Sequence, residues 1–263
     1  TNEELFIPSP SGMLPTPHAE ELWPVVRTAL GSLQQAFEPQ AFDPCKDDRS
    51  FTLAMADATA ALFVPALVKR FQREGTRVAL RIVPLVSRDP RELLEQGRAD
   101  VALGFFPDLG SGDGGVIRQA PLYASEYICV MRRDHPLAAP AALSLDAYCA
   151  AQHLRVSFAG RARGFVDDAL ALLGRQRSVM ITVNSYFTAG LTVHQSELLT
   201  VLPRSFGPAT GFMPHLISRE LPFALPPIEV RQVWHGRHER DPAQRWLRAA
   251  LAQAAAEVSG ALE

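Results

Sequence analysis

The chain lacks several features that would assign a function at once. Its cysteines, Cys45, Cys129 and Cys149, are an odd number and lie far apart, without CxxC or Cys/His spacing. The sequence therefore indicates neither a disulfide framework nor a structural zinc site. No apolar run reaches the roughly 18 residues that a membrane span requires, and the first residues lack the basic and apolar regions of a signal peptide. We expect a cytoplasmic protein with reduced thiols and no membrane contact.

Positive charge is not in excess either. The 263 residues carry a formal net charge of −2, whereas a DNA-binding module usually has a basic excess. We find no GxSxG, HExxH or GxxxxGK[ST] motif, and no GxGxxG after a strand. His235, His238 and Asp241 are close in sequence, but their loop context and the lack of a fourth ligand argue against a metal site. We therefore expect no catalysis, no cofactor, no metal and no DNA binding by this segment alone.

The first 49 residues differ in pattern from the rest. Residues 1–17 are rich in Pro, Ser and Gly and cannot form a core alone. Thr16-Pro17 then predicts the start of a helix over 17–38, in which Pro24 should cause a kink or a delay. Apolar residues of this helix follow a 4-3-4-3 heptad spacing: Leu22, Val26, Ala29, Leu33 and Ala36. This spacing fits pairing with a second chain or packing on the chain's own domain equally well. The prolines and charges of 39–49 indicate a linker.

From residue 50 the pattern alternates between strands and helices, twice. The first set is predicted at 51–56, 62–74, 77–86, 91–97 and 101–106, followed by a loop rich in glycine over 108–115. The second set is predicted at 154–158, 165–173, 178–183, 187–194 and 198–202, and a strand at 229–234 and a helix at 242–258 close the chain. Each set reads β-α-β-α-β, which favours a parallel sheet with right-handed crossovers. We predict a two-lobed α/β clamshell of the periplasmic-binding-protein type (type 2).

A ligand of such a protein should lie beyond the carboxyl ends of the parallel strands, where helix N-termini present free N–H groups. This rule, with the family likeness described below, selects the candidate ligand-binding residues. They are Thr59, Ser87, Arg88, Phe106, Phe158, Arg163, Gly164, Ser185, Tyr186, Phe187 and His235.

Arg163 is the strongest of these candidates. It lies in the glycine-flanked loop 160–164 directly before a predicted helix, and a guanidinium beside a helix N-terminus is a good anchor for a carboxylate. Phe158, Tyr186 and Phe187 are candidates for an aromatic wall. Alternatively, Arg163 is a solvated surface residue, the three aromatic residues belong to the core of a lobe, and His235, which follows Trp234, has a structural role.

Several segments resemble the LysR-type transcriptional regulators. Residues 5–17, with Leu5-Phe6, Gly12-Met13 and Pro15-Thr16-Pro17, are similar to the end of the wing of their winged helix-turn-helix, although Ile7-Pro8 replace the usual Val-Arg. Helix 17–38 resembles the family's linker helix. The segments 51–57, 98–104 and 134–137 resemble parts of the effector domain, and the likeness extends over almost the whole chain.

Three further segments are similar to the subgroup that senses nitroaromatics, salicylate-type acids and nodulation flavonoids. They are 157–168, 196–203 and the Trp234-His235 region with Arg245-Trp246-Leu247-Arg248. In that subgroup the position matching Arg163 often contacts the ligand, and Ser185-Tyr186 fall on another contact segment. The resemblance therefore implies a small aromatic or planar anionic co-inducer.

The resemblance also implies an organisation and a set of partners. We expect a remnant of the wing at 1–17, a linker helix and hinge at 18–49, lobe I at 50–151 completed by 232–263, and lobe II at 152–231. DNA would be bound through a mostly missing N-terminal domain, and a homodimer or homotetramer would form through helix 18–38 and lobe contacts. A transporter's solute-binding protein and an enzyme on the same fold, such as a biosynthetic deaminase or a dehydratase-like protein, are the alternatives.

Overall fold

The computed structural model describes residues 4–10, 12–37, 41–107, 109–110, 116–139, 142–207 and 214–260. The chain divides into two compact units, Thr1–Ala41 and Phe42–Glu263. The glycine-rich loop predicted at 108–115 falls largely outside the described residues.

The first unit is a hairpin followed by one long helix. Strands β1 (Phe6–Ser9) and β2 (Gly12–Pro15) pair antiparallel, and α1 spans Pro17–Phe37. The Thr16 hydroxyl accepts a hydrogen bond from the Ala19 N–H at 3.3 Å, so it caps the helix as its residue type predicts. Pro24 lies inside α1 without ending it.

The apolar seam of α1 is open to solvent in the single chain. Val26 is 44% exposed and Leu33 is 53% exposed, while Leu22 is half-buried. The side chain of Ala36 lies outside the described residues. Exposure of this kind is what a pairing helix shows before its partner binds, and pairing itself stays a prediction.

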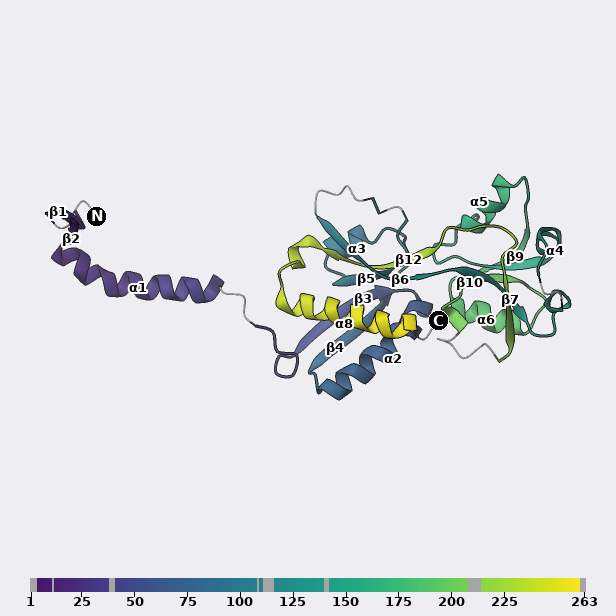
Figure 1. Cartoon of the computed structure of the whole chain (residues 1–263), viewed down its shortest axis with the longest axis horizontal. Coiled ribbons are helices and arrows are strands. Elements are labelled where there is room, and N and C mark those ends of the chain that lie inside the picture. The colour runs from purple at the N-terminus through teal and green to yellow at the C-terminus, as the bar shows by residue number, and fades with distance from the viewer. Residues whose placement is uncertain are drawn as a thin grey trace. The chain divides into compact units, whose positions relative to one another are not determined.

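Lobe I of the second unit is a five-stranded sheet in the order β4-β3-β5-β12-β6. Its strands are β3 (Arg49–Met55), β4 (Val78–Pro84), β5 (Val101–Gly104), β6 (Ile117–Ser125) and β12 (Ile228–His235). The first three are parallel, and β12 runs antiparallel to both of its neighbours. Helices α2 (Asp57–Glu74) and α8 (Pro242–Gly260) cover one face, and α3 (Arg91–Glu95) lies on the other (Figure 1).

Lobe II repeats this design. It contains β7 (Tyr127–Arg132), β8 (Gln152–Val156), β9 (Ser178–Val183), β10 (Thr200–Pro203) and β11 (Leu216–Glu220). A bridge between His153 and Leu199 joins the β8-β9 pair to the β10-β7-β11 sheet, so the combined order is β9-β8-β10-β7-β11. Helices α4 (Leu145–Ala150) and α5 (Phe165–Leu172) cover one face, and α6 (Tyr186–His194) covers the other.

The predicted two-lobed α/β fold is confirmed, but the lobes exchange strands at other places than expected. The predicted boundary at 151/152 assigns residues 127–151 to lobe I, whereas β7 pairs with β10 and β11 of lobe II. The return to lobe I occurs at Ile228, where β12 begins, rather than at 232. In each lobe the fourth strand of the sheet therefore comes from the other half of the chain, and both crossings lie beside the space between the lobes.

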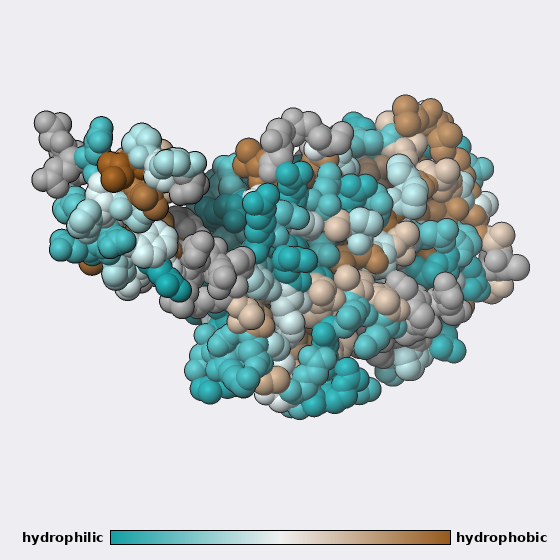
Figure 2. Space-filling model, turned by 60° about the vertical axis from the view of Figure 1, so that its left-hand side comes forward, coloured by the Kyte–Doolittle hydropathy of each residue, from teal (hydrophilic) through white to brown (hydrophobic). Residues whose placement is uncertain are grey.

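Buried apolar side chains alternate along the central strands and fill both faces of each sheet. In lobe I, Phe51 and Leu53 pack under α2 and α8, while Ala54 faces α3. Some hydrophobic side chains remain at the surface (Figure 2). On lobe II these include Leu172 at 90% exposure and Met180 at 72%, which marks this surface as a candidate for contact with another molecule.

Candidate functional site

A cleft of about 190 Å³ lies where the two lobes meet. It opens at the carboxyl ends of the parallel strands, the edge at which open α/β sheets bind ligands. Lobe I lines it with residues that follow β3, β4 and β5, and lobe II with residues that follow β8 and with the first residues of α5 and α6. The cleft also continues beneath α5, where Val166, Val201 and Arg177 line it.

Seven of the eleven predicted site residues line this cleft. They are Thr59, Ser87, Arg88, Phe158, Arg163, Gly164 and Tyr186. They come from both lobes, so the strand-end rule places them together although up to 127 residues of sequence separate them. Their roles in binding remain predictions.

Phe106 and His235 lie elsewhere. Phe106 is 4% exposed and packs in the core beneath α3 together with Ala102. Side chains alternate along this segment, so Phe105 rather than Phe106 lines the cleft. His235 ends β12, whose antiparallel course puts Trp234 beside Val101, the first residue of β5. It is therefore at the end of the sheet opposite the cleft, where its Nδ1 accepts a hydrogen bond from the Arg237 N–H at 3.1 Å. We correct the predicted site by leaving both residues out.

Ser185 and Phe187 take part in a contact between the lobes. The Ser185 hydroxyl donates to a carboxylate oxygen of Asp57 at 2.7 Å, and the Phe187 N–H donates to the same oxygen at 3.3 Å. Asp57 begins α2 of lobe I, and Ser185 caps α6 of lobe II. The N-terminus of α6, expected to face a ligand, is therefore occupied by a carboxylate from the other lobe. Neither Ser185 nor Phe187 lines the cleft.

Aromatic side chains form two walls of the cleft. Phe158 and Tyr186 meet edge to face with ring centroids 5.3 Å apart. Tyr127 stacks on Phe165 at 4.3 Å, and the Arg88 guanidinium lies 6.0 Å from the centroid of the Phe165 ring. Burial raises the pKa of Tyr127 to about 12, so this phenol stays neutral at physiological pH. The walls offer flat apolar surface and a cation–π contact from lobe I.

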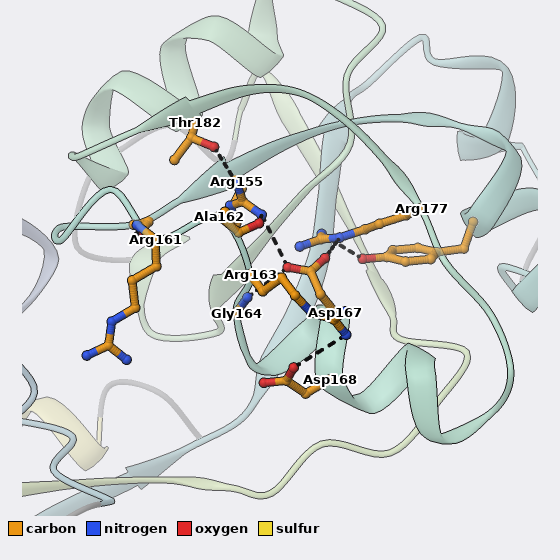
Figure 3. Close-up of polar contacts among 11 residues, drawn as sticks. Arg155, Arg161, Ala162, Arg163, Gly164, Asp167, Asp168, Arg177 and Thr182 are labelled. Carbon is orange, nitrogen blue, oxygen red and sulfur yellow. Dashed lines mark hydrogen bonds and ion pairs between the residues drawn. The ribbon is translucent and has the colours of Figure 1, made fainter.

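The charge of the cleft has one sign. Its lining includes five arginines and no aspartate or glutamate: Arg88, Arg155, Arg161, Arg163 and Arg177. Such a surface attracts anions and repels cations. Arg163, the predicted anchor, has a side chain that is 66% exposed and lies 3.7 Å from Asp168. Arg161 extends away from the carboxylate of Asp167 (Figure 3).

Arg155 and Arg177 are the buried members of this set, with side chains 14% and 3% exposed. Both pair with Asp167, through Arg155 Nη1 at 3.3 Å and Arg177 Nε at 2.8 Å (Figure 3). Burial raises the pKa of Asp167, but the hydrogen bond and charge of Arg177, the Gly164 N–H and the hydrogen bond from Arg155 outweigh it and hold that pKa below its usual value. Asp167 is therefore a stable anion between two cations.

Sequence reasoning missed Arg155 and Arg177. Arg155 left a signal, because it is the one charged residue in the strand predicted at 154–158. An ionised side chain in a buried strand needs a partner or a function. Arg177 stands before its strand in a polar turn, and nothing in its local sequence distinguishes it from a solvated arginine.

Two other kinds of site find no support in the described part of the chain. Within it, no group of three His, Cys, Asp or Glu residues is placed to hold a metal ion. None of the helices described there is long and apolar enough to cross a membrane.

Comparison with known proteins agrees with this architecture. A family model described as the LysR substrate binding domain matches residues 46–256. The chain is 30% identical to the HTH-type transcriptional activator NagR of a Ralstonia species, over 94% of this chain and 80% of that protein. It is also 30% identical to the HTH-type transcriptional activator NahR of Pseudomonas putida, over 94% of this chain and 81% of the relative.

Solved structures give the same result. The chain superposes on a probable transcriptional regulator from Pseudomonas aeruginosa, PA0477, with a TM-score of 0.72 and 32% identity, covering 95% of this chain and 82% of the other. The regulatory domain of the activator MexT, also from Pseudomonas aeruginosa, matches 79% of this chain and 98% of its own length with a TM-score of 0.68. The chain belongs to the LysR family of transcriptional regulators, and residues 46–256 match the substrate-binding domain of that family.

Proposed function

We propose that this chain is the sensing part of a LysR-type regulator and that its cleft binds a small, flat aromatic molecule with an acidic group. The observation that carries the proposal is the lining of the cleft, which combines arginine side chains, no carboxylate and aromatic rings from lobe II. A guanidinium favours a planar anion, and the rings favour a flat apolar body. The resemblance to the subgroup that senses aromatic acids supports the same class of ligand.

In the proposed complex the ring lies against Phe158 and Tyr186, and Thr59 and Ser87 approach it from lobe I. All four line the cleft. Because residues of both lobes touch the ligand, its binding free energy depends on how the lobes are placed. That dependence is what a sensor needs, since a ligand shifts a conformational equilibrium only by its differential affinity for the two states.

The first unit would connect the sensor to DNA. Its β1-β2 hairpin resembles the end of a wing, and α1 carries the exposed seam of Val26 and Leu33. We propose that α1 pairs with α1 of a second copy, so that the regulator acts as a homodimer or a homotetramer. Lobe surfaces with exposed apolar residues such as Met180 would add to this assembly.

The test is a thermal-shift screen of monocyclic and bicyclic aromatic carboxylates, followed by calorimetry on the compounds that raise the melting temperature. A ligand at a hundred times its Kd stabilises the folded form by about 2.7 kcal/mol. We expect Phe158→Ala to weaken binding about tenfold, through the loss of a ring contact. Phe187→Ala is the matched control because Phe187 does not line the cleft. Equal affinities for both variants would place the ligand elsewhere, and a screen without any binder would reject the ligand class.

A further inference from the structure

The floor of the cleft under α5 contains a buried group of charges that does not balance. Arg155 comes from β8, Arg177 precedes β9, and Asp167 lies in the first turn of α5. The Asp167 carboxylate accepts from Arg155 Nη1 at 3.3 Å, from Arg177 Nε at 2.8 Å and from the Gly164 N–H at 2.8 Å. One carboxylate is thus the ion-pair partner of two guanidinium groups.

The remaining partners of this group are neutral. Arg155 also donates to the Ala162 carbonyl at 2.6 Å and to the Thr182 hydroxyl at 2.9 Å, and Arg177 donates to the Tyr148 hydroxyl at 3.2 Å. In the described part of the chain, no second carboxylate pairs with either guanidinium. The side chains of Arg155, Asp167 and Arg177 are 14%, 15% and 3% exposed. A charge that is largely shielded from water and lacks a counter-charge is unfavourable, so the net positive charge of the cluster favours binding of an anion.

The cluster also has donors to spare. Arg155 Nε is buried and has no hydrogen-bond partner among the described residues. The hydrogen bonds of Arg177 to described residues use Nε and Nη1, and Nη2 makes none of them. Both side chains line the cleft, together with Phe165 and Val166 at the start of α5. The first N–H groups of an α-helix have no partner within the helix, and its dipole favours an anion there.

We propose that Arg155, Arg177 and the N-terminus of α5 form the subsite for the acidic group of the ligand, with Asp167 as the residue that positions both arginines. This inference rests on the proposed function, because it places the carboxylate of the aromatic effector at one end of the same cleft. The subsite takes a planar carboxylate, which can accept from a guanidinium and from backbone N–H groups at once.

The subsite replaces Arg163 as the principal anchor. The Arg163 side chain is 66% exposed and has Asp168 beside it at 3.7 Å, and solvent screens exposed charge pairs strongly. Arg177, at 3% exposure, acts in a far drier environment, where a charged hydrogen bond is stronger. The ring of the ligand then extends from beneath α5 toward Phe158 and Tyr186.

The experiment compares benzoate with benzamide, which has nearly the same shape and no charge. Calorimetry on the full chain should show benzoate binding ten- to a hundredfold more tightly than benzamide, as one or two charged hydrogen bonds predict. Arg155→Gln should reduce this preference to within threefold and leave the affinity for benzamide unchanged. Arg118→Gln removes the same charge from an exposed position outside the cleft and should retain the preference.

A second variant guards against loss of folding. Arg155→Lys keeps the charge but cannot reproduce the fork of donors, and it should weaken benzoate five- to tenfold with no effect on benzamide. A benzoate preference that survives both Arg155 variants would overturn the subsite and make the cluster a structural ion network. Equal wild-type affinity for benzoate and benzamide would overturn it too, while leaving the proposed function in place. Failure of both probes to bind at about 10 mM, the Kd expected of a weak fragment, would overturn the subsite. Only an unsuccessful screen of larger aromatics would also reject the proposed function.

Discussion

The buried histidine of lobe II should make the stability of the protein depend on pH. His153 is 0% exposed, and its Nε2 lies 2.8 Å from the Tyr148 carbonyl oxygen. Its other ring nitrogen is buried without a hydrogen-bond partner among the described residues. Burial lowers the pKa of His153 from 6.5 to about 4, the nearby Arg177 charge acts in the same direction, and the bond to the Tyr148 carbonyl opposes them.

The direction of the pH dependence follows from which state of the protein, folded or unfolded, binds the proton. Below pH 6.5 His153 takes up a proton in the unfolded chain, whereas the same side chain stays neutral in the folded protein until about pH 4. The unfolded state therefore binds more protons over this range, and the free energy of unfolding falls as the pH falls. Each pKa unit corresponds to about 1.4 kcal/mol, so the whole effect is about 3 kcal/mol, most of which is reached at pH 4.5. Above pH 7 His153 is neutral in both the folded and the unfolded state, so it no longer contributes to the pH dependence of stability.

Urea unfolding of wild type and His153→Gln at pH 7.5, 6.5, 5.5 and 4.5 measures this contribution. Glutamine keeps a donor for the Tyr148 carbonyl but does not titrate. The difference in unfolding free energy between the two proteins should shift by about 2–3 kcal/mol in favour of the variant between pH 7.5 and pH 4.5. His215→Gln, at an exposed position, should follow the wild type. If wild type and His153→Gln lose stability in parallel, burial does not hold His153 neutral and the reasoning fails.

Two further predictions concern assembly and the contact between the lobes. Leu22→Asp combined with Leu33→Asp should shift the protein to a smaller species in light scattering, because burying each leucine stabilises a pair by about 1.5–3 kcal/mol; an unchanged mass would show that the seam does not pair chains. Asp57→Ala should lower the free energy of unfolding in urea by about 1–3 kcal/mol through loss of the charged bonds from Ser185 and Phe187. Asp168→Ala, at an exposed residue, should change it by less than about 0.5 kcal/mol, and equal effects would refute a stabilising contact.

The alternating pattern of the sequence was sufficient to predict the parallel part of each lobe. β9 was predicted at 178–183 and is found at Ser178–Val183, and α5 was predicted at 165–173 and is found at Phe165–Leu172. α5 buries Val166 and Leu170, one helical turn apart, so its periodicity is visible locally. β9 has no fully buried residue, but its β-branched residues favour a strand. Thr16-Pro17 likewise predicted the start of α1, and Thr16 caps that helix.

The strands that cross between the lobes were beyond this reasoning. β7 carries a near-continuous apolar run, Tyr127–Met131, that suits the centre of any sheet, and its place in lobe II depends on pairing with β10 and β11 far along the chain. The direction of β12 is equally non-local. Because it runs antiparallel to β5, its end at His235 points away from the cleft, and a rule for parallel strands selected the wrong end.

The site was predicted in outline because strand ends are local features, whereas its charges are not. Arg163 has the expected loop and helix beside it, but exposure and Asp168 reduce its value as an anchor. The sequence could not show that Arg155 and Arg177, 22 residues apart, meet at one carboxylate. Burial decides which of several arginines interacts strongly with an anion. Burial in turn depends on how α5 packs over the sheet, which the local sequence does not show.

The contacts between the lobes suggest how a ligand could be sensed at all. Around the cleft, Asp57 of lobe I binds the N-terminus of α6, and Arg88 of lobe I lies over Phe165 of lobe II. These contacts hold the lobes together, and an effector need supply only the free energy that separates this arrangement from another one. A few kcal/mol is sufficient to shift such an equilibrium. An anion at Arg155 and Arg177 would act on α5, which carries Phe165, so the binding site and the contact with Arg88 share one helix.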